Sequence, residues 1–380
     1  VYGIGLIPLG GYVKIAGMID ESMDTEHLEK EPEPWEYRSK PAWQRLIIIS
    51  GGIIVNLILG FAIYMMVALI WGKTVLTNEN LPAGFEVAEV MKSYGFNDGD
   101  KILKVNGDDI ENVIDINKFL FLRDINSVTV ERYNGIKENI SIPENIGTVM
   151  FENGAMNAFV PLVPAVIDSI VPDSPAYNAS LAKGDKIIKV NGNDIIKWQD
   201  FTELVKLNTS SNISVEIERG GDVISKLIPL NEDKKIGVSV LLPKIVPTKI
   251  EYSFFESINE GYQMAYWTLT DYIGQFKYVF TKKGASQLGG FGAIGSLFPA
   301  TWNWKGFWET TALISIILAF MNALPIPALD GGHAMFLFYE MLTGRKPNDK
   351  IVGYAQMLGF FLLIALVLFA NGNDLYRWLF

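Results

Sequence analysis

Apolar residues gather in three long runs that contain few or no charges. The first run covers 46–72, the second 308–343 and the third 351–370, and Pro325 and Pro327 interrupt the second. Each is about as long as the ~20 residues that a helix needs to cross a bilayer. One such run alone could be a buried core helix, but three together predict a membrane protein with transmembrane segments at these positions.

Basic residues flank these runs in a consistent way. They precede the first run and lie between the second and third, at Arg38, Lys40, Arg45, Arg345, Lys346 and Lys350. Three spans in series put both flanks on one side, which the positive-inside rule makes cytoplasmic. We therefore expect a cytoplasmic β-loop region over 1–45 and an extracytoplasmic middle segment over about 73–305.

The middle segment contains an internal repeat. The sequence GDKILKVNGDDI at 99–110 returns as GDKIIKVNGNDI at 184–195, with ten of twelve positions identical. Each copy has an apolar strand, an Asn-Gly turn, an amphipathic helix and further alternating strands, which predicts a hairpin-based domain. The pattern resembles PDZ domains, so we expect PDZ domains at 75–150 and 155–245.

PDZ domains bind extended peptides by adding a strand to a sheet edge. The two copies therefore predict peptide ligands, or else they are spacers with unused grooves. After them, 250–307 is rich in aromatic residues and charges, which favours a helix along the membrane surface and a connector. A helix packed on the second PDZ domain is the alternative.

Composition agrees with a membrane protein and narrows its partners. Hydrophobic residues make up 49% of the chain and charged residues 19%, which is a low share for a soluble protein. The net charge of −10 argues against a nucleic-acid partner. The chain has no cysteine, so disulfides and thiolate metal sites are excluded. The expected fold class is a multi-span α-helical membrane protein with two inserted α+β (mostly β) PDZ domains.

Asp330 is the most informative residue for chemistry. It lies in NALPIPALDGGH, within the second apolar run. A carboxylate at membrane depth is costly and by default marks a functional site. Two prolines nearby break the helix, and irregular backbone at this depth survives only beside protein or a water-filled cavity. The alternative is that Asp330 caps the helix that follows it.

The chain resembles the site-2 protease family of intramembrane zinc metalloproteases. The resemblance rests on GLIPLGGYVKIAG at 5–17, on Gly51, Gly52 and Asn56 of the first run, on the two PDZ-like copies, and on NALPIPALDGGH. It implies a Zn²⁺ enzyme of a bacterial inner membrane that cleaves single-span membrane proteins. Asp330 would be its third protein ligand, beside two histidines and a glutamate base from a His-Glu-x-x-His helix.

This sequence contains no His-Glu-x-x-His, and its histidines are His27 and His333. His27 lies in a charged stretch that reads as a solvated loop. His333 follows Asp330 by three residues and could face the same side of a helix, which leaves an Asp-His metal site as a remote alternative. We expect the missing helix to lie upstream of Val1 and this chain alone to be inactive.

Candidate substrate-binding residues lie in two places. Gly10, Gly11 and Tyr12 belong to a predicted turn between short strands, whose sheet edge could hold a substrate in extended form. Asn322 could donate to an unwound substrate backbone, or it could simply be a polar contact between spans. The rival function is a non-catalytic membrane scaffold that binds peptides, and a PDZ-bearing serine protease is weaker because no G-x-S-x-G occurs.

Overall fold

The computed structural model describes residues 15–17, 33–230 and 233–379. The predicted substrate residues Gly10, Gly11 and Tyr12, and also His27, lie outside this part of the chain. Two compact units divide the molecule: a helical unit of Val1–Gly72 with Glu251–Phe380, and a β-rich unit of Lys73–Ile250. The middle segment is thus inserted between two membrane-type parts, as the apolar pattern predicts.

Within its described residues, the helical unit contains three helices that are long and apolar enough to cross a membrane, namely α1, α10 and most of α12. In chain order its helices are η2 (Tyr37–Ser39), α1 (Ala42–Trp71), α7 (Phe254–Val279), α8 (Lys282–Gln287), α9 (Phe291–Ser296), α10 (Trp304–Ala323), α11 (Asp330–Thr343) and α12 (Asp349–Leu379). The second apolar run is therefore two helices, because the prolines between them remove backbone donors and end α10.

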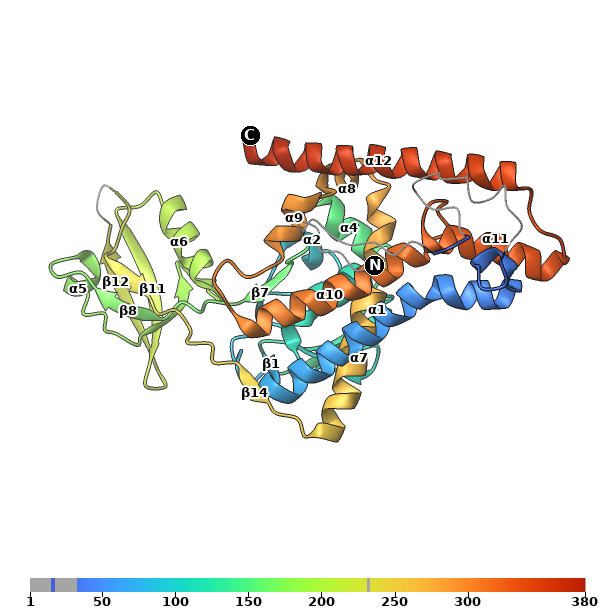
Figure 1. The fold of residues 1–380 in the computed structure, drawn as a ribbon. Helices are drawn as coiled ribbons and strands as arrows, with labels where there is room; N and C mark the ends of the chain where they lie inside the picture. The colour runs from blue at the N-terminus through green and yellow to red at the C-terminus, as the bar shows by residue number, and fades with distance from the viewer. Residues whose placement is uncertain (1–14, 18–32, 231–232, 380) are drawn as a thin grey trace. The chain divides into compact units, whose positions relative to one another are not determined.

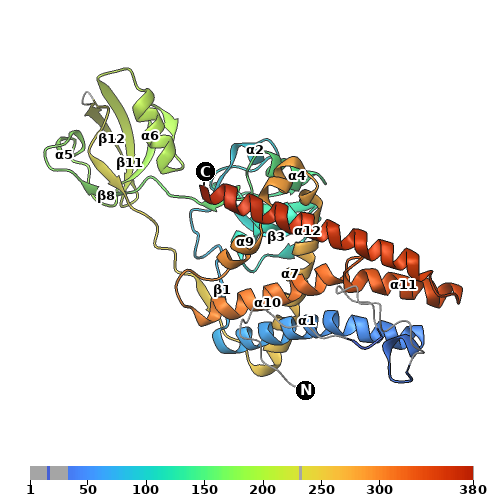
Figure 2. The same cartoon turned by 45° about the horizontal axis from the view of Figure 1, so that its top comes forward.

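Helix α7 crosses α1 and α10 instead of running alongside them (Figures 1 and 2). The crossing is close because Gly261 faces the backbone of α1, where a Cβ would lie 2.6 Å from the nitrogen of Met65. Ser253 and Glu256 form a capping box that starts the helix. The predicted aromatic segment is thus a helix of the membrane-type unit.

The β-rich unit is built from two copies of one pattern. The first copy has β1 (Lys73–Val75), β2 (Phe85–Val87), α2 (Glu89–Lys92), β3 (Lys101–Val105), β4 (Asp108–Asp109), η3 (Val113–Asp115), α3 (Ile116–Leu122), β5 (Ser127–Glu131), β6 (Lys137–Ser141), α4 (Ile146–Glu152) and β7 (Phe159–Pro161). The second has β8 (Ile167–Ile170), α5 (Pro175–Asn178), β9 (Lys186–Val190), β10 (Asn193–Asp194), α6 (Trp198–Leu207), β11 (Asn212–Arg219), β12 (Asp222–Pro229), β13 (Val238–Val240) and β14 (Thr248–Ile250).

The copies share one sheet order, β4-β3-β5-β6 in the first and β10-β9-β11-β12 in the second. In both Asn-Gly turns the asparagine and the glycine have positive φ, with 52° and 89° at Asn106 and Gly107. This backbone is the tight hairpin turn that the repeat predicts. Each copy has its own hydrophobic core.

The ends of the copies differ from the predicted boundaries. Strand β7 pairs antiparallel with β2, so 159–161 completes the first copy although the pattern assigned it to the second. Strand β14 pairs with β1, which joins the two ends of the inserted unit in one short ladder. The repeat motif marks the centre of each copy well, whereas a strand contributed from far along the chain leaves no local signal.

Candidate functional site

The site is organised by helix α1 and by the broken line of α10 and α11 beside it. Helix α10 packs antiparallel on the second half of α1 (Figure 1), where Gly60 of α1 faces Ile316 of α10. The hydroxyl of Ser315 donates to the carbonyl oxygen of Asn56 at 2.8 Å. A small residue and a buried hydroxyl are typical of helices that pack closely in a membrane.

Between α10 and α11 the chain makes a tight turn over 324–329. Ala328 has a φ of 79°, which is unusual for a residue with a side chain, and Leu329 takes the N-cap position of α11. Gly331 and Gly332 press against the backbone carbonyls of the turn, where a Cβ would lie 2.3 and 2.4 Å from the nearest oxygen. Only glycine fits these two positions, so the glycines after Asp330 pack the start of α11 against the turn.

Asp330 is the first residue of α11, and its carboxylate lies beside α1. A Cβ on Gly52 would come within 3.6 Å of the Oδ2 atom of Asp330. Gly52 lies ten residues after Ala42, the first residue of α1, which corresponds to about 15 Å along the helix axis. Helix α1 has 30 residues, or about 45 Å, and contains no charged residue after Arg45. Half-buried Asp330 therefore lies beside the uncharged part of α1, about a third of the way along the helix.

Asp330 fits a metal centre as one ligand. A carboxylate oxygen is a suitable zinc ligand, and catalytic zinc takes three protein ligands. Within the described part of the chain, no three His, Cys, Asp or Glu side chains group in a way that could hold a metal ion. The imidazole of His333 lies beside Gln356 of α12, with 3.3 Å between the Nε2 atom of Gln356 and the Nδ1 atom of His333.

Asn322 lies in the last turn of α10 and is half-buried. The turn places it near Asp330 at the break between α10 and α11, because Gly331 packs on the carbonyl oxygen of Ala323. The structure thus places these two predicted site residues in one region. The predicted substrate residues at 10–12 lie in the part of the chain that is not described.

Two further contacts near the site escaped the sequence patterns. The guanidinium of Arg45 on α1 pairs with the carboxylate of Glu340 on α11 at 2.5 Å. Gly359 of α12 lies against the turn, where a Cβ would be 1.8 Å from the carbonyl oxygen of Pro327. The sequence could have indicated the contact of Glu340, because an acidic residue in an apolar run is costly unless it is paired.

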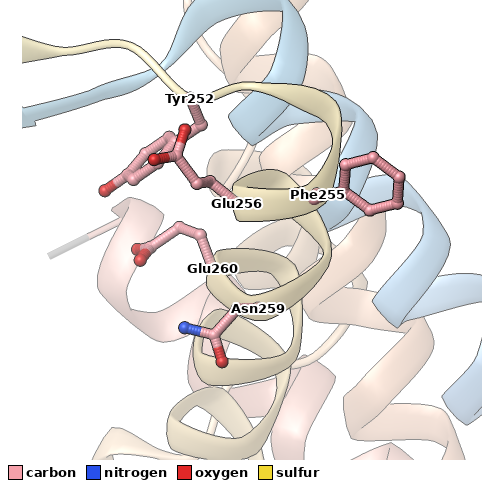
Figure 3. Close-up of a pocket in the computed structure, with 5 residues that line it drawn as sticks. All are labelled: Tyr252, Phe255, Glu256, Asn259 and Glu260. Carbon is pink, nitrogen blue, oxygen red and sulfur yellow. The ribbon is translucent and has the colours of Figure 1, made fainter.

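A pocket of about 400 Å³ lies at the start of α7 (Figure 3). Its lining is Tyr252, Phe255, Glu256, Asn259 and Glu260. The carboxylate of Glu256 already accepts a hydrogen bond from the backbone nitrogen of Ser253 at 2.8 Å, which gives it a structural role. The pocket contains none of the residues that the sequence selects.

These features define a class: a helical membrane-type protein with an inserted β-rich unit and, at a helix break, a carboxylate beside the uncharged part of α1. The chain belongs to peptidase family M50, whose model matches residues 1–366. The predicted resemblance to intramembrane metalloproteases is thereby confirmed.

Relatives with similar sequences carry protease names. The chain is 28% identical over 411 residues to the regulator of sigma E protease of Haemophilus influenzae. It is 27% identical over 404 residues to the regulator of sigma-E protease RseP of Escherichia coli, and 26% over 401 residues to a putative zinc metalloprotease of Vibrio cholerae. Each match covers 99% of this chain and 87% of the relative.

Proposed function

We propose that the protein containing this chain is a zinc metalloprotease that hydrolyses a peptide bond of single-span membrane proteins within the bilayer, with Asp330 as one zinc ligand. The observation that carries the proposal is the depth of Asp330, beside Gly52 and about 15 Å into α1. A carboxylate there is costly unless it serves a site. Membership in a peptidase family and the relatives named as zinc metalloprotease support the same function.

The residues of this chain have distinct roles in that site. Asp330 supplies one negatively charged oxygen ligand, and the glycine at position 52 leaves space beside the carboxylate. Bound zinc supplies polarisation of the scissile carbonyl and a water of lowered pKa. Because the printed sequence holds no His-Glu-x-x-His, the remaining ligands and the general base come from residues outside it in this proposal.

A peptide bond becomes accessible only when the substrate helix unwinds, since an intact helix uses its backbone groups internally. Asn322 offers an amide donor for such an unwound segment, at the same turn as Asp330. The residues at 10–12 are the proposed edge for the extended chain. In this proposal the metal ligand and the backbone donor lie on either side of one helix break.

We assign the two copies of the β-rich unit as PDZ domains that act as a size filter or recognition platform. In the first copy the side chain of Asn117 on α3 already occupies part of the edge of β7 where a peptide strand would pair. Its amide oxygen accepts from the backbone nitrogen of Phe159 at 2.9 Å, and its amide nitrogen donates to the carbonyl oxygen of Phe159 at 2.8 Å. Among the described strands, β7 pairs with β2 alone and β13 with β8 alone, so the Asn117 contacts are what distinguishes the first copy. A peptide strand therefore fits the second copy better than the first.

The proposed location is a bacterial inner membrane, with the β-rich unit outside the cytoplasm. The ion pair of Arg45 and Glu340 supports the topology, since it joins the start of α1 to the end of α11. Both ends carry the basic flanks that the positive-inside rule assigns to the cytoplasm. The rival function, a membrane scaffold that only binds peptides, needs no carboxylate beside the uncharged part of α1.

Asp330→Asn tests the proposal in the protein that carries the His-Glu-x-x-His segment. Asn has nearly the same shape as Asp, and at the first position of α11 it loses only the ~0.3–1 kcal/mol that a carboxylate gains from the helix dipole, so a structural role tolerates the change. A metal ligand does not, and we expect cleavage of a membrane-anchored reporter to fall at least ~100-fold with loss of bound zinc. Exposed Asp194→Asn is the matched control and should match the wild type.

Full cleavage by Asp330→Asn would contradict the metal-ligand assignment and favour the scaffold. Zinc content is measured on the same purified samples by elemental analysis. Loss of cleavage with zinc retained would also remove Asp330 from the ligand set.

A further inference from the structure

Arg45 and Glu340 form a mostly buried ion pair between α1 and α11. The Nη2 atom of Arg45 donates to the Oε1 atom of Glu340 at 2.5 Å, and their side chains are only 11% and 13% exposed. Two more contacts hold the arginine: its Nε atom donates to the carbonyl oxygen of Lys40 at 2.9 Å, and the Tyr37 ring lies 5.9 Å from the guanidinium. The arginine side chain is therefore held in one place.

This pair and Asp330 lie at opposite ends of one helix–helix contact. Helices α1 and α11 run antiparallel, with Arg45 against Glu340 at one end and Gly52 against Asp330 at the other. Gly52 follows Arg45 by seven residues, or about 10.5 Å, and Glu340 follows Asp330 by ten residues, or about 15 Å. The ion pair thus fixes α11 against α1 ten residues after Asp330.

At the Asp330 end the fixation comes from backbone packing. Gly331 and Gly332 lie on the carbonyl oxygens of the turn. These contacts hold α11 to the turn and do not hold it to α1. The ion pair is a charged contact that joins α11 directly to α1. Buried ionic contacts of this kind are best attested as devices that set register, and breaking one leaves an uncompensated buried charge.

We propose that Arg45 and Glu340 are positioning residues that set the register of α11 on α1 and so place the Asp330 carboxylate. The inference rests on the proposed function of Asp330. A slip of one helical residue moves a side chain by about 1.5 Å along the axis. A misplacement of about 1 Å is enough to lower a catalysed rate about 100-fold.

The test uses the full-length protein with Arg45→Gln, Glu340→Gln, and the reversed pair Arg45→Glu with Glu340→Arg. Reporter cleavage gives kcat and KM, competition with a chromogenic chelator gives the zinc dissociation constant, and thermal unfolding reports folding. We expect each single variant to lose about 10- to 100-fold in kcat with little change in KM, and to bind zinc about 10-fold more weakly. The reversed pair should recover most of both.

The matched control is Arg345→Gln, which removes the same charge from an exposed arginine near the same end of α11. It should leave all three measurements unchanged. Arg45→Lys keeps the charge without the fixed fork of the guanidinium, so it should fold and lie between wild type and Arg45→Gln. This variant keeps the test decisive where a neutral variant does not fold.

Folded single variants with wild-type kcat and zinc affinity would overturn the inference, even with lowered thermal stability. So would a folded reversed pair that recovers neither property. Asp330→Asn, measured in parallel, separates the two proposals. If it retains cleavage, the proposed function fails; if it is inactive while the ion-pair variants are normal, only the positioning role fails.

Discussion

Gly359→Ala tests whether α12 supports the turn that carries Asp330. The added Cβ would lie 1.8 Å from the carbonyl oxygen of Pro327 and 2.4 Å from its carbon. Ordinary contact begins at 3.4 Å, so the helix or the turn must move by about 1.6 Å. Backbone atoms on both sides form this contact, and neither can swing aside as a flexible side chain can.

The energetic cost follows from two opposed effects. Overpacking costs about 1–3 kcal/mol, and replacing glycine by alanine inside a helix gains up to about 1 kcal/mol. Gly353→Ala is the matched control, because it lies on the same helix with nothing within 4 Å of its added Cβ. The difference between the two variants should therefore be about 1–3 kcal/mol.

We expect Gly359→Ala to unfold at least about 2 °C below Gly353→Ala in detergent. In the full-length protein, reporter cleavage should also fall about 100-fold, because the shift exceeds the ~1 Å that a reacting geometry tolerates. The control should cleave as the wild type does. Wild-type cleavage and unfolding in Gly359→Ala would refute the packing of α12 on this turn.

Two further predictions concern the β-rich unit. Burial favours the neutral carboxyl of Asp185, but the hydrogen bonds that Arg219 donates through Nε and Nη2 outweigh burial and lower the pKa of Asp185. Burial raises the pKa of Asp100. Its arginine, Arg132, does not outweigh burial, because it divides its donors between Asp100 and Glu138. As pH falls from about 5 to 3, amide-exchange protection should therefore drop in β11, because protonation of Asp185 removes its ion pair with Arg219. Over the same range, protection in β5 should hold or rise, because burial favours the neutral carboxyl of Asp100. A change of the same sign in both strands would contradict this prediction. Cysteines at the exposed positions Asn139 and Ser225 should react with an impermeant thiol reagent added to intact cells, and reaction only after lysis would reverse the proposed topology.

Local patterns predict the elements of this protein well. The two Asn-Gly turns adopt the expected positive φ angles, and the apolar runs become α1, α10 with α11, and α12. What they miss depends on contacts between distant segments. Strand β7 joins β2 across more than seventy residues, and no local signal assigns it to the first copy.

The same distinction applies to the site. Asp330 stands out in the sequence because a charge in an apolar run is costly, and the residues after it predict a close backbone approach. Gly359 does not stand out, because one glycine among several in an apolar helix has no special spacing. Its role becomes visible only where α12 meets Pro327.

The position of Asp330 can be understood from what surrounds it on three sides. Gly52 of α1 leaves room beside the carboxylate, Gly331 and Gly332 let α11 start directly on the turn, and α12 covers the turn at Gly359. Irregular backbone at membrane depth survives where protein covers it, and these contacts provide that cover. A larger residue at any of these glycines would either fill the space beside the carboxylate or separate the helices around it. The glycines thus allow a charged side chain and an unwound turn to lie together beside the uncharged part of α1, as the proposed hydrolysis requires.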